Sequence, residues 1–311
     1  MLDVRRMRVL REVARRGSFS AAAESLAYTQ SAVSQQIAAL EREAGTRLVE
    51  RNARGVRLTD AGRALVDHAD AILARLADAE EELQAIAGVR SGRLRLAAFP
   101  SACATLMPLA VARYRERHPG VELSLMPADP DDALRLLRAG DCDVALNIEP
   151  AFAPAADDDL DGTFLLDDPM YIMLPREHRL ADRARVRIGD LADESWMVGT
   201  TASCPDASIF LRACQTAGFE PRIAFHLDDY SAIQGFVAAG MGVSFIPDLA
   251  LVALRDDVVV RSLGARPPIR RVVATTMRGS FCSPARQAML EVLTEVAAEF
   301  GERRAQLELA S

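Results

Sequence analysis

Apolar residues in the first sixty positions recur with the spacing of amphipathic helices, and small polar residues separate the helical segments. The pattern predicts three helices, over residues 3–16, 21–26 and 30–43. Gly17 ends the first helix, and Ser20 and Thr29 are expected to cap the second and the third. Two short helices joined by a tight turn, the second of them polar on one side, are typical of a helix-turn-helix.

The third predicted helix has an apolar stripe and an opposite face that suits a DNA groove. Val33, Ile37 and Leu40 recur at i, i+4 and i+7 and are expected to be buried. The opposite face carries small or forked side chains that fit a major groove, where Gln can bond adenine and Ala can touch a thymine methyl group. A merely solvated face is the alternative, although such faces usually carry pairs of Glu and Arg. The residues expected to contact DNA are Thr29, Gln30, Ser31, Ser34, Gln35, Ala38 and Arg42.

Two short β-prone segments follow and flank residues 52–55, which predicts a hairpin wing. Arg51, Arg54 and Arg57 are expected to lie along phosphates or in the minor groove. A charged hairpin is often only solvated, but its position directly after a helix-turn-helix favours a DNA contact. Together these segments predict a winged helix-turn-helix DNA-binding domain over residues 1–59.

A long helix is predicted from residue 59 or 60 to about residue 87, with apolar residues at alternating spacings of four and three. Such a heptad pattern is typical of helices that pair. The helix could bury this seam against its own chain, but we favour a dimer because residues 60–89 link two domains. A dimer would present two reading helices to the half-sites of an imperfect palindrome. The expected dimerisation residues are Leu65, Ala69, Ile72, Leu76, Ala79, Leu83 and Ile86.

Strand and helix patterns alternate after a short hinge that contains Gly88 and Gly92. The first set predicts strands over 94–98, 121–125 and 143–147 and helices over 103–117 and 131–139. The second set predicts strands over 170–174, 195–198, 223–227 and 243–246 and helices over 204–217 and 230–239. The chain then returns through a strand over 269–277 and a helix over 284–300. A β-α-β-α-β order indicates a parallel sheet covered by helices, so the predicted fold class is α/β multidomain.

Charge separates a basic head from an acidic body. The chain of 311 residues has a net charge of −7, but residues 1–66 contain 12 arginines against 7 acidic residues. This asymmetry is expected of a DNA-binding module joined to another domain. No apolar run is long enough to span a bilayer, and the N-terminus lacks the pattern of a signal peptide. We therefore expect a cytoplasmic protein without a membrane partner.

Residues 18–26, 29–37, 45–51 and 58–62 closely resemble the signature of LysR-type transcriptional regulators. Val49 stands where the family usually has Phe and Ser31 where it often has Pro, and neither departure puts the fold in doubt. Because Ser31 and Gln35 lie on the reading face, the preferred bases cannot be taken from a relative. Residues 237–247 are also similar to a family segment.

The resemblance implies a C-terminal effector domain over residues 90–311 that is similar to periplasmic binding proteins. Its two subdomains would be residues 90–164 with 267–311, and residues 165–266. The chain would cross between them near residues 162–166 and 263–268. The family also implies operator DNA, RNA polymerase and further copies of the chain as partners, in a homotetramer with a homodimer as the minimum.

An effector in such a fold is expected in the crevice at the carboxyl ends of the strands. Hydroxyl groups and helix-terminal amides meet there, so the hypothesis is a small anionic metabolite. Each Ser or Thr could equally be an N-cap. The resemblance implies effector contacts for Ser101, Ile148 and Thr201. The full expected set is Pro100, Ser101, Ala102, Asn147, Ile148, Thr200, Thr201, Ala202, Ser203 and Phe245.

A thiol-based redox sensor is the alternative function. Cys204 and Cys214 lie ten residues apart, nearly the spacing found in the peroxide-sensing branch of the family. However, Cys214 falls on an apolar helical stripe, and no His or Lys stands beside Cys204 to lower its pKa. An enzyme is not expected because the sequence lacks a GxSxG, P-loop or HExxH motif, and no cofactor or metal is expected either. A purely architectural DNA-binding protein would not need the acidic α/β body.

Overall fold

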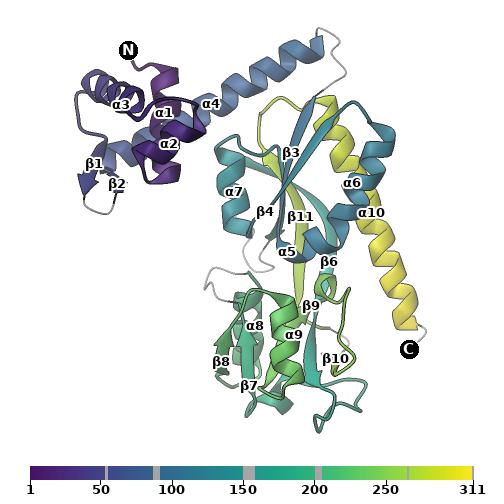
Figure 1. Cartoon of the computed structure of the whole chain (residues 1–311). Coiled ribbons are helices and arrows are strands. Elements are labelled where there is room, and N and C mark those ends of the chain that lie inside the picture. Colours follow the sequence, from purple (N-terminus) through teal and green to yellow (C-terminus); the bar gives the residue numbers. More distant parts are fainter. Residues whose placement is uncertain (53–54, 87–91, 150–157, 200–204, 265, 310–311) are drawn as a thin grey trace. The chain divides into compact units, whose positions relative to one another are not determined.

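The computed structural model describes residues 1–52, 55–86, 92–149, 158–199, 205–264 and 266–309 (Figure 1). The chain divides into two compact units, of which the first contains residues 1–89 and the second most of the remaining chain. Each unit has its own buried apolar clusters. Nowhere in the described ranges is a helix long and apolar enough to cross a membrane.

The described elements of the first unit are α1 (Val4–Arg16), α2 (Phe19–Ser25), α3 (Gln30–Ala44), β1 (Val49–Asn52), β2 (Gly55–Leu58) and α4 (Asp60–Ile86). Side chains at the helix starts explain the first three boundaries. Asp3, Ser18 and Thr29 accept hydrogen bonds from backbone amides in the first turns of α1, α2 and α3. Gly17 and Gly45 end α1 and α3 in the left-handed conformation, which glycine adopts without steric cost.

The predicted start of α2 was wrong by two residues. Ser18 rather than Ser20 caps the helix, because Ser18 has extended backbone angles and its side chain accepts from the amide of Ala21. Phe19 then lies in the first turn and is buried, whereas Ser20 is exposed. The hydrophobic contact of Phe19 with the core therefore sets where this helix begins.

Helices α1 to α4 close one apolar core. Val33, Ile37 and Leu40 of α3 are buried in it, as their spacing predicted. Leu65 and Ala69, the first two residues of the predicted dimer seam, belong to the same core. They pack inside the chain's own unit and are not available to a partner, which corrects the N-terminal part of the seam.

Strands β1 and β2 form the predicted hairpin wing. They pair antiparallel, with Val49 opposite Leu58. Glu41 of α3 holds the start of the hairpin, because its Oε1 accepts hydrogen bonds from the amides of Leu48 at 2.9 Å and Val49 at 3.3 Å. The amide of Val56 donates to the carbonyl of Gly17 at 3.0 Å. The wing is thus fixed to both α1 and α3 by backbone and side-chain hydrogen bonds.

The second unit begins with an α/β lobe whose described elements precede and follow the rest of the unit in sequence. They are β3 (Arg93–Ala98), α5 (Pro100–Ala104), α6 (Leu106–Arg117), β4 (Glu122–Pro127), α7 (Pro130–Arg138), β5 (Val144–Glu149), the first part of β6 (Leu160–Pro175), β11 (Ile269–Met277) and α10 (Pro284–Leu309). The other lobe contains the rest of β6, a 3-10 helix η1 (Ile188–Leu191), β7 (Ser195–Val198), α8 (Pro205–Thr216), β8 (Arg222–His226), α9 (Tyr230–Ala238), β9 (Val243–Pro247), η2 (Asp248–Ala250) and β10 (Val258–Ser262).

One long strand joins the two lobes. In the described residues the strand order is β4-β3-β5-β11-β6-β9-β7-β8, with β10 on β6. Residues 160–169 of β6 pair with β11, and residues 170–175 pair with β9 and β10 (Figure 1). The first crossing therefore lies near Pro169, later than the predicted 162–166, because β6 continues through it without a turn. The second crossing lies between the end of β10 at Ser262 and the start of β11 at Ile269.

The sheet is mixed rather than parallel throughout. Strands β3, β4 and β5 are parallel, as are β7, β8 and β9, but β6 and β11 run antiparallel to their neighbours. The helix predicted over 103–117 is two helices that break at Thr105, whose hydroxyl donates to the carbonyl of Ser101 at 2.6 Å. Strand β10 was not predicted, and α10 extends nine residues beyond its predicted end at residue 300.

We predict that Gly62→Ala destabilises the first unit by about 1–3 kcal/mol, because small-to-large changes in packed sites force backbone shifts. A Cβ at this buried position of α4 would lie 2.0 Å from the carbonyl oxygen of Leu48. Calorimetry of the full chain measures the effect. The matched control is Gly301→Ala in α10, where a Cβ meets nothing within 4 Å, and which should gain about 0.5–1 kcal/mol. An unchanged melting profile for Gly62→Ala would contradict the packing described.

Candidate DNA-binding surface and ligand pocket

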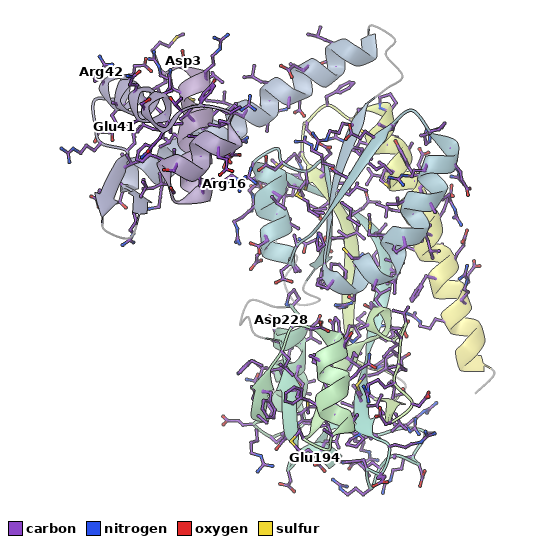
Figure 2. The ribbon with its side chains drawn as sticks, in the orientation of Figure 1. Asp3, Arg16, Glu41, Arg42, Glu194 and Asp228 are labelled. Carbon is purple, nitrogen blue, oxygen red and sulfur yellow. The ribbon has the colours of Figure 1, made fainter. Side chains whose placement is uncertain are left out.

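Helix α3 presents the face that the sequence predicted for reading DNA. Gln30, Ser31, Gln35, Ala38 and Arg42 are exposed, and Ser34 is half-buried at the edge of the face. Thr29 is also exposed, and its hydroxyl lies 3.0 Å from that of Ser31 while it caps the helix. Figure 2 shows the Arg42 side chain on this helix. The exposed set thus offers short hydrogen-bonding groups at the helix start and a cation near its end.

Neighbouring glutamines of α3 have different surroundings. Gln35 is exposed, whereas the Oε1 of Gln36 accepts a hydrogen bond from Nε of Arg6 at 3.2 Å. Arg6 also pairs with Glu43, so the inner side of α3 is tied to α1 by charged groups as well as by apolar contacts. Gln35 is therefore the more exposed of the two amides.

The wing also presents a cation at the surface of the first unit. Arg57 is exposed on β2, and its backbone pairs with that of Glu50. Arg51 lies in β1, but its side chain is outside the described residues, and so is all of Arg54. Of the three predicted wing contacts, only Arg57 is therefore placed at the surface.

The later part of the α4 seam faces solvent. Leu76 is 47% exposed and Leu83 is 65% exposed, with Ile72 and Ala79 also exposed. The side chain of Ile86 lies outside the described residues. Large apolar side chains exposed at heptad spacing along one helix favour burial against another helix.

A pocket of about 650 Å³, including its open mouth, lies between the two lobes of the second unit. We call it the Arg270 pocket. Of the residues expected to bind an effector, Pro100, Ser101, Ile148 and Phe245 line it. Ala102 and Asn147 are buried but do not line it, and the Asn147 Oδ1 instead accepts from the amide of Ile148 at 2.7 Å. The expected contacts at residues 200–203 lie outside the described residues.

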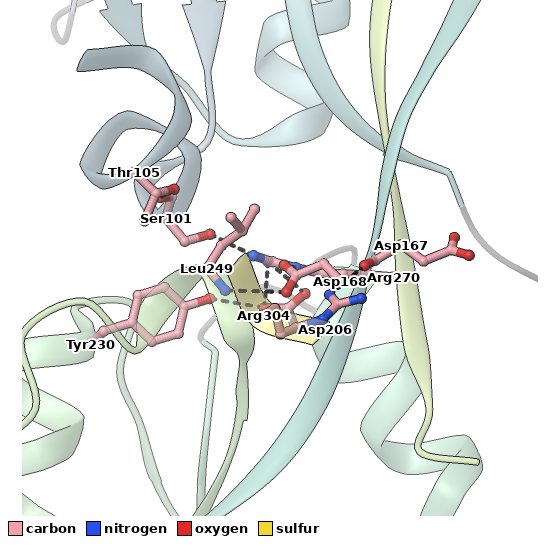
Figure 3. Close-up of polar contacts among 9 residues, drawn as sticks. All are labelled: Ser101, Thr105, Asp167, Asp168, Asp206, Tyr230, Leu249, Arg270 and Arg304. Carbon is pink, nitrogen blue, oxygen red and sulfur yellow. Dashed lines mark hydrogen bonds and ion pairs between the residues drawn. The ribbon is translucent and has the colours of Figure 1, made fainter. Parts of the chain in front are cut away.

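A buried arginine that the sequence analysis missed forms one wall of this pocket (Figure 3). Arg270 of β11 is 1% exposed, and its Nε donates to Asp168 of β6 at 2.6 Å. Its Nη1 donates to both carboxylate oxygens of Asp206, at 3.1 and 3.2 Å, and its Nη2 donates to the Ser101 hydroxyl at 2.6 Å. Because Ser101 belongs to one lobe and Asp206 to the other, the guanidinium group bridges the lobes.

The partners of Arg270 are themselves held by hydrogen bonds. The second oxygen of Asp168 accepts from the amide of Leu249 at 3.1 Å, and Asp206 accepts from the Tyr230 hydroxyl at 2.9 Å. The carbon of the guanidinium lies 5.0 Å from the centre of the Phe99 ring, a cation–π distance. Hydrogen bonds within the protein therefore hold Arg270 and both of its aspartate partners in position.

The ionised state of this pair follows from its contacts. Burial lowers the pKa of Arg270, but the carboxylates of Asp206 and Asp168 outweigh it and raise that pKa overall. Burial raises the pKa of Asp168, while its hydrogen bonds from Arg270 and Leu249 oppose the change. Because a protonated Asp168 would leave a buried guanidinium without its nearest counter-charge, the ionised pair is the state that we expect at neutral pH.

Both units match descriptions of one protein family. Residues 4–63 match the model "Bacterial regulatory helix-turn-helix protein, lysR family", and residues 87–298 match the model "LysR substrate binding domain". The chain belongs to the LysR family. It is a LysR-type DNA-binding transcriptional regulator with an effector-binding domain.

Individual proteins agree with this assignment. The regulator is 31% identical over 300 residues to the probable transcriptional regulator LrrA of Synechococcus elongatus, covering 96% of this chain and 98% of that one. Its fold is similar to that of full-length OxyR from Pseudomonas aeruginosa, with a TM-score of 0.73, 24% identity and coverage of 96% and 95%. It is also similar to full-length CbnR in complex with its target DNA, with a TM-score of 0.67, 21% identity and coverage of 95% and 100%.

The cysteines do not favour the redox alternative for this regulator. Cys214 is buried in the apolar cluster that contains Trp196 and Phe210, and burial raises its pKa to about 12. A thiol with this pKa is protonated at neutral pH and is a poor nucleophile. Cys204 lies outside the described residues. No observation on the described residues thus supports a reactive pair.

We predict that Arg270→Met destabilises the effector-binding unit by about 3–5 kcal/mol, because it leaves a buried carboxylate without its counter-charge. Urea unfolding followed by the fluorescence of Trp196, which is buried and is the single tryptophan of the chain, reports on this unit. The double variant Arg270→Met/Asp168→Asn should recover part of the loss.

The neighbouring Arg271 provides the matched control for this variant. Its Nε lies 3.8 Å from Glu149, and both side chains are about half exposed. Arg271→Met should therefore cost only about 0–1 kcal/mol. Equal losses at the two positions would show that the Arg270 network contributes no more than a surface ion pair.

Proposed function

We propose that this regulator binds an imperfect palindromic operator as a homo-oligomer, and that a small molecule in the Arg270 pocket changes promoter activity. The observation that carries the DNA-binding part is the exposed face of α3, which is rich in Ser and Gln and is oriented by its buried stripe. We assign residues 1–59 to DNA binding, residues 60–89 to the linker helix and residues 90–311 to effector sensing.

The side chains of α3 and the wing make two kinds of DNA contact, to base edges and to phosphates. Gln35, Ser34 and Ala38 suit base edges in the major groove, since Gln pairs with adenine in a bidentate manner. Thr29 and Gln30 at the helix start suit phosphate oxygens, as do Arg42 and the wing arginines, and Ser31 can bond either a phosphate or a base edge. Phosphate contacts supply affinity and salt dependence, whereas the Gln35 contact supplies sequence preference.

Pairing through α4 would supply the two-fold symmetry of a palindromic site. The exposed Ile72, Leu76, Ala79 and Leu83 form the part of the seam that a second copy can cover. Leu65 and Ala69 do not take part, since they are in the core of their own unit. We therefore place the dimer contact in the second half of the helix.

Contacts between effector units would extend the dimer to a tetramer. Strands β4 and β8 are the two edges of the described sheet path, and an uncovered edge strand readily pairs with another chain. Apolar side chains are exposed on these strands and on the helices α6 and α8. They are Leu125, Ile223, Phe225, Leu109 and Leu211. A homotetramer, with a homodimer as the minimum, is the assembly that we propose.

The Arg270 pocket is the proposed effector site because its wall bridges two lobes. A ligand shifts a conformational equilibrium only if it binds the two states with different affinity. A molecule that changes the contacts of Ser101, Asp206 or Tyr230 would satisfy this condition, since these groups come from both lobes. The altered unit would then change how the DNA-bound oligomer contacts RNA polymerase.

We predict that Gln35→Ala weakens binding to the selected operator by about tenfold or more and relaxes base preference, because a bidentate base contact is worth about 1–3 kcal/mol. The operator is first obtained by selection from random duplexes, and binding is measured by fluorescence anisotropy at fixed salt.

The adjacent amide provides the control for this substitution. Gln36→Ala removes the same group from the side of α3 that faces Arg6, so affinity for the operator should change less than twofold. Equal losses for both variants would contradict the assigned reading face. A chain that selects no duplex sequence at all would contradict the proposed function itself.

We predict that Leu76→Glu or Leu83→Glu raises the dissociation constant of the dimer by roughly tenfold or more, because a carboxylate cannot be buried unpaired in a helix seam. Light scattering at several concentrations measures the assembly. Ala71→Glu adds the same charge at an exposed position of α4 outside the seam and should leave the mass unchanged. Wild-type mass in both leucine variants would place the dimer contact elsewhere.

A further inference from the structure

The charged groups around the Arg270 pocket are unequal in number. Within the described part of the lining, the acidic residues are Asp129, Asp206 and Asp228, and the basic residue is Arg270. Asp168 lies directly behind Arg270 and is 0% exposed. One cation therefore stands against four carboxylates, and the surface that meets a ligand has an excess of negative charge.

All three nitrogens of the wall arginine already donate to groups of the protein. Its Nε, Nη1 and Nη2 already donate to Asp168, Asp206 and Ser101, and the residue is 1% exposed. An incoming carboxylate that bound Nε or Nη1 would have to replace Asp168 or Asp206. Displacing Asp206 would leave that carboxylate without its ion pair. The free energy lost there would offset the free energy gained from the new contact with Arg270.

The N-termini of three helices beside the pocket, α7, α8 and α9, carry carboxylates of the chain. Asp206 lies in the first turn of α8, and Asp131 and Asp132 lie in that of α7. The Asp229 side chain accepts from the first amides of α9, Ser231 at 2.6 Å and Ala232 at 3.2 Å. The positive ends of these three helix dipoles are thus matched internally, whereas the first turn of α5, which carries Ser101, has no acidic residue. The dipoles of α7, α8 and α9 therefore give no reason to expect an anionic effector.

Asp129 at the mouth of the pocket experiences this excess of charge directly. Partial burial raises its pKa, and the nearby carboxylates of Asp228, Asp131 and Asp206 raise it further. A cation placed among these groups would relieve their repulsion, whereas an anion would add to it.

The rest of the lining suits an organic body. The rings of Phe99, Tyr230 and Phe245 and the side chains of Ile148 and Met197 face the same space. Aromatic faces attract cations, and apolar walls gain free energy by covering hydrocarbon. A metal ion fits less well, since no group of three carboxylate, His or Cys side chains in the described ranges is placed to coordinate one.

From these observations we infer that the effector of the Arg270 pocket is a small organic cation, with an ammonium or guanidinium group among Asp129, Asp206 and Asp228 and a hydrocarbon part against Phe99 and Phe245. This inference rests on the proposed function of the pocket and names the chemical class of its ligand.

The test uses compounds that differ in charge but share one hydrocarbon body. The full-length protein is melted with benzylamine, benzyl alcohol and benzoate, and with the butyl series of amine, alcohol and carboxylate, at equal millimolar concentrations. We expect the amines to raise the melting temperature and the carboxylates to leave it unchanged. A ligand at a hundred times its dissociation constant stabilises the native state enough for a melt to resolve.

Two substitutions of equal charge change locate the binding. Asp129→Asn should weaken amine binding by about tenfold, as expected for the loss of a charge-assisted hydrogen bond. Asp129 directly precedes α7, and Asn is as good an N-cap as Asp. Because the substitution also removes repulsion from the nearby carboxylates, the ligand-free melting temperature should not fall. Asp182→Asn, which is exposed and does not line the pocket, should bind the amines as the wild type does.

Three outcomes would overturn the inference. They are a larger shift with the carboxylates than with the amines, no shift with any member of either series, and amine shifts that survive Asp129→Asn unchanged. Operator binding is measured on the same samples. Intact DNA binding together with any of these outcomes would reject the cationic effector but not the DNA-binding function. If the carboxylates raise the melting temperature, the proposal that the pocket binds an effector would also stand.

Discussion

The buried ion pair of Arg270 and Asp168 is the constraint on which the effector-binding unit depends. A guanidinium group that is 1% exposed is tolerated only when its charge and its donors are matched. Its partners come from α5, β6 and α8, so both lobes must fold around it before it is satisfied. Through its bonds to Asp206, Arg270 therefore fixes the relation of the two lobes more specifically than apolar packing does, because a hydrogen bond depends on direction as well as distance.

Local signals predicted the first unit well and the pocket poorly. Thr29 and Gly45 mark the two ends of α3, because helix capping depends on residues that are close in sequence. Strand β11 also begins and ends at the predicted residues. Asp168 and Arg270 are 102 residues apart, and no periodicity links them. One signal was available: Arg270 and Arg271 are consecutive in a strand, where side chains alternate between faces. One of the two arginines had to point inward, and a buried arginine requires a carboxylate.

Helix α4 shows a second limit of sequence patterns. Its heptad spacing is continuous, yet Leu65 and Ala69 pack in their own core while Leu76 and Leu83 are exposed. Packing within a chain and pairing between chains both require an apolar residue every three or four positions, so the period cannot separate them. For a related reason, the sequence analysis did not predict the first part of β6, which lies in the lobe that contains β11. The strand passes from one set of neighbours to another without any change in its own conformation.

The charge of the pocket shows why a buried arginine is weak evidence for an anionic ligand. The rule that anions favour helix N-termini holds here, but at α8 and α9 Asp206 and Asp229 of the chain already satisfy it. Asp206 is shared by Arg270 and Tyr230, and it belongs to the bridge between lobes. An anion would compete with Asp206 for Arg270, and a cation would compete with Arg270 for Asp206. Either would weaken the bridge, but after a cation binds, Arg270 keeps Asp168 and Asp206 keeps a positive partner. Only the cation can therefore loosen the lobes while every charge of the bridge keeps an ion-pair partner.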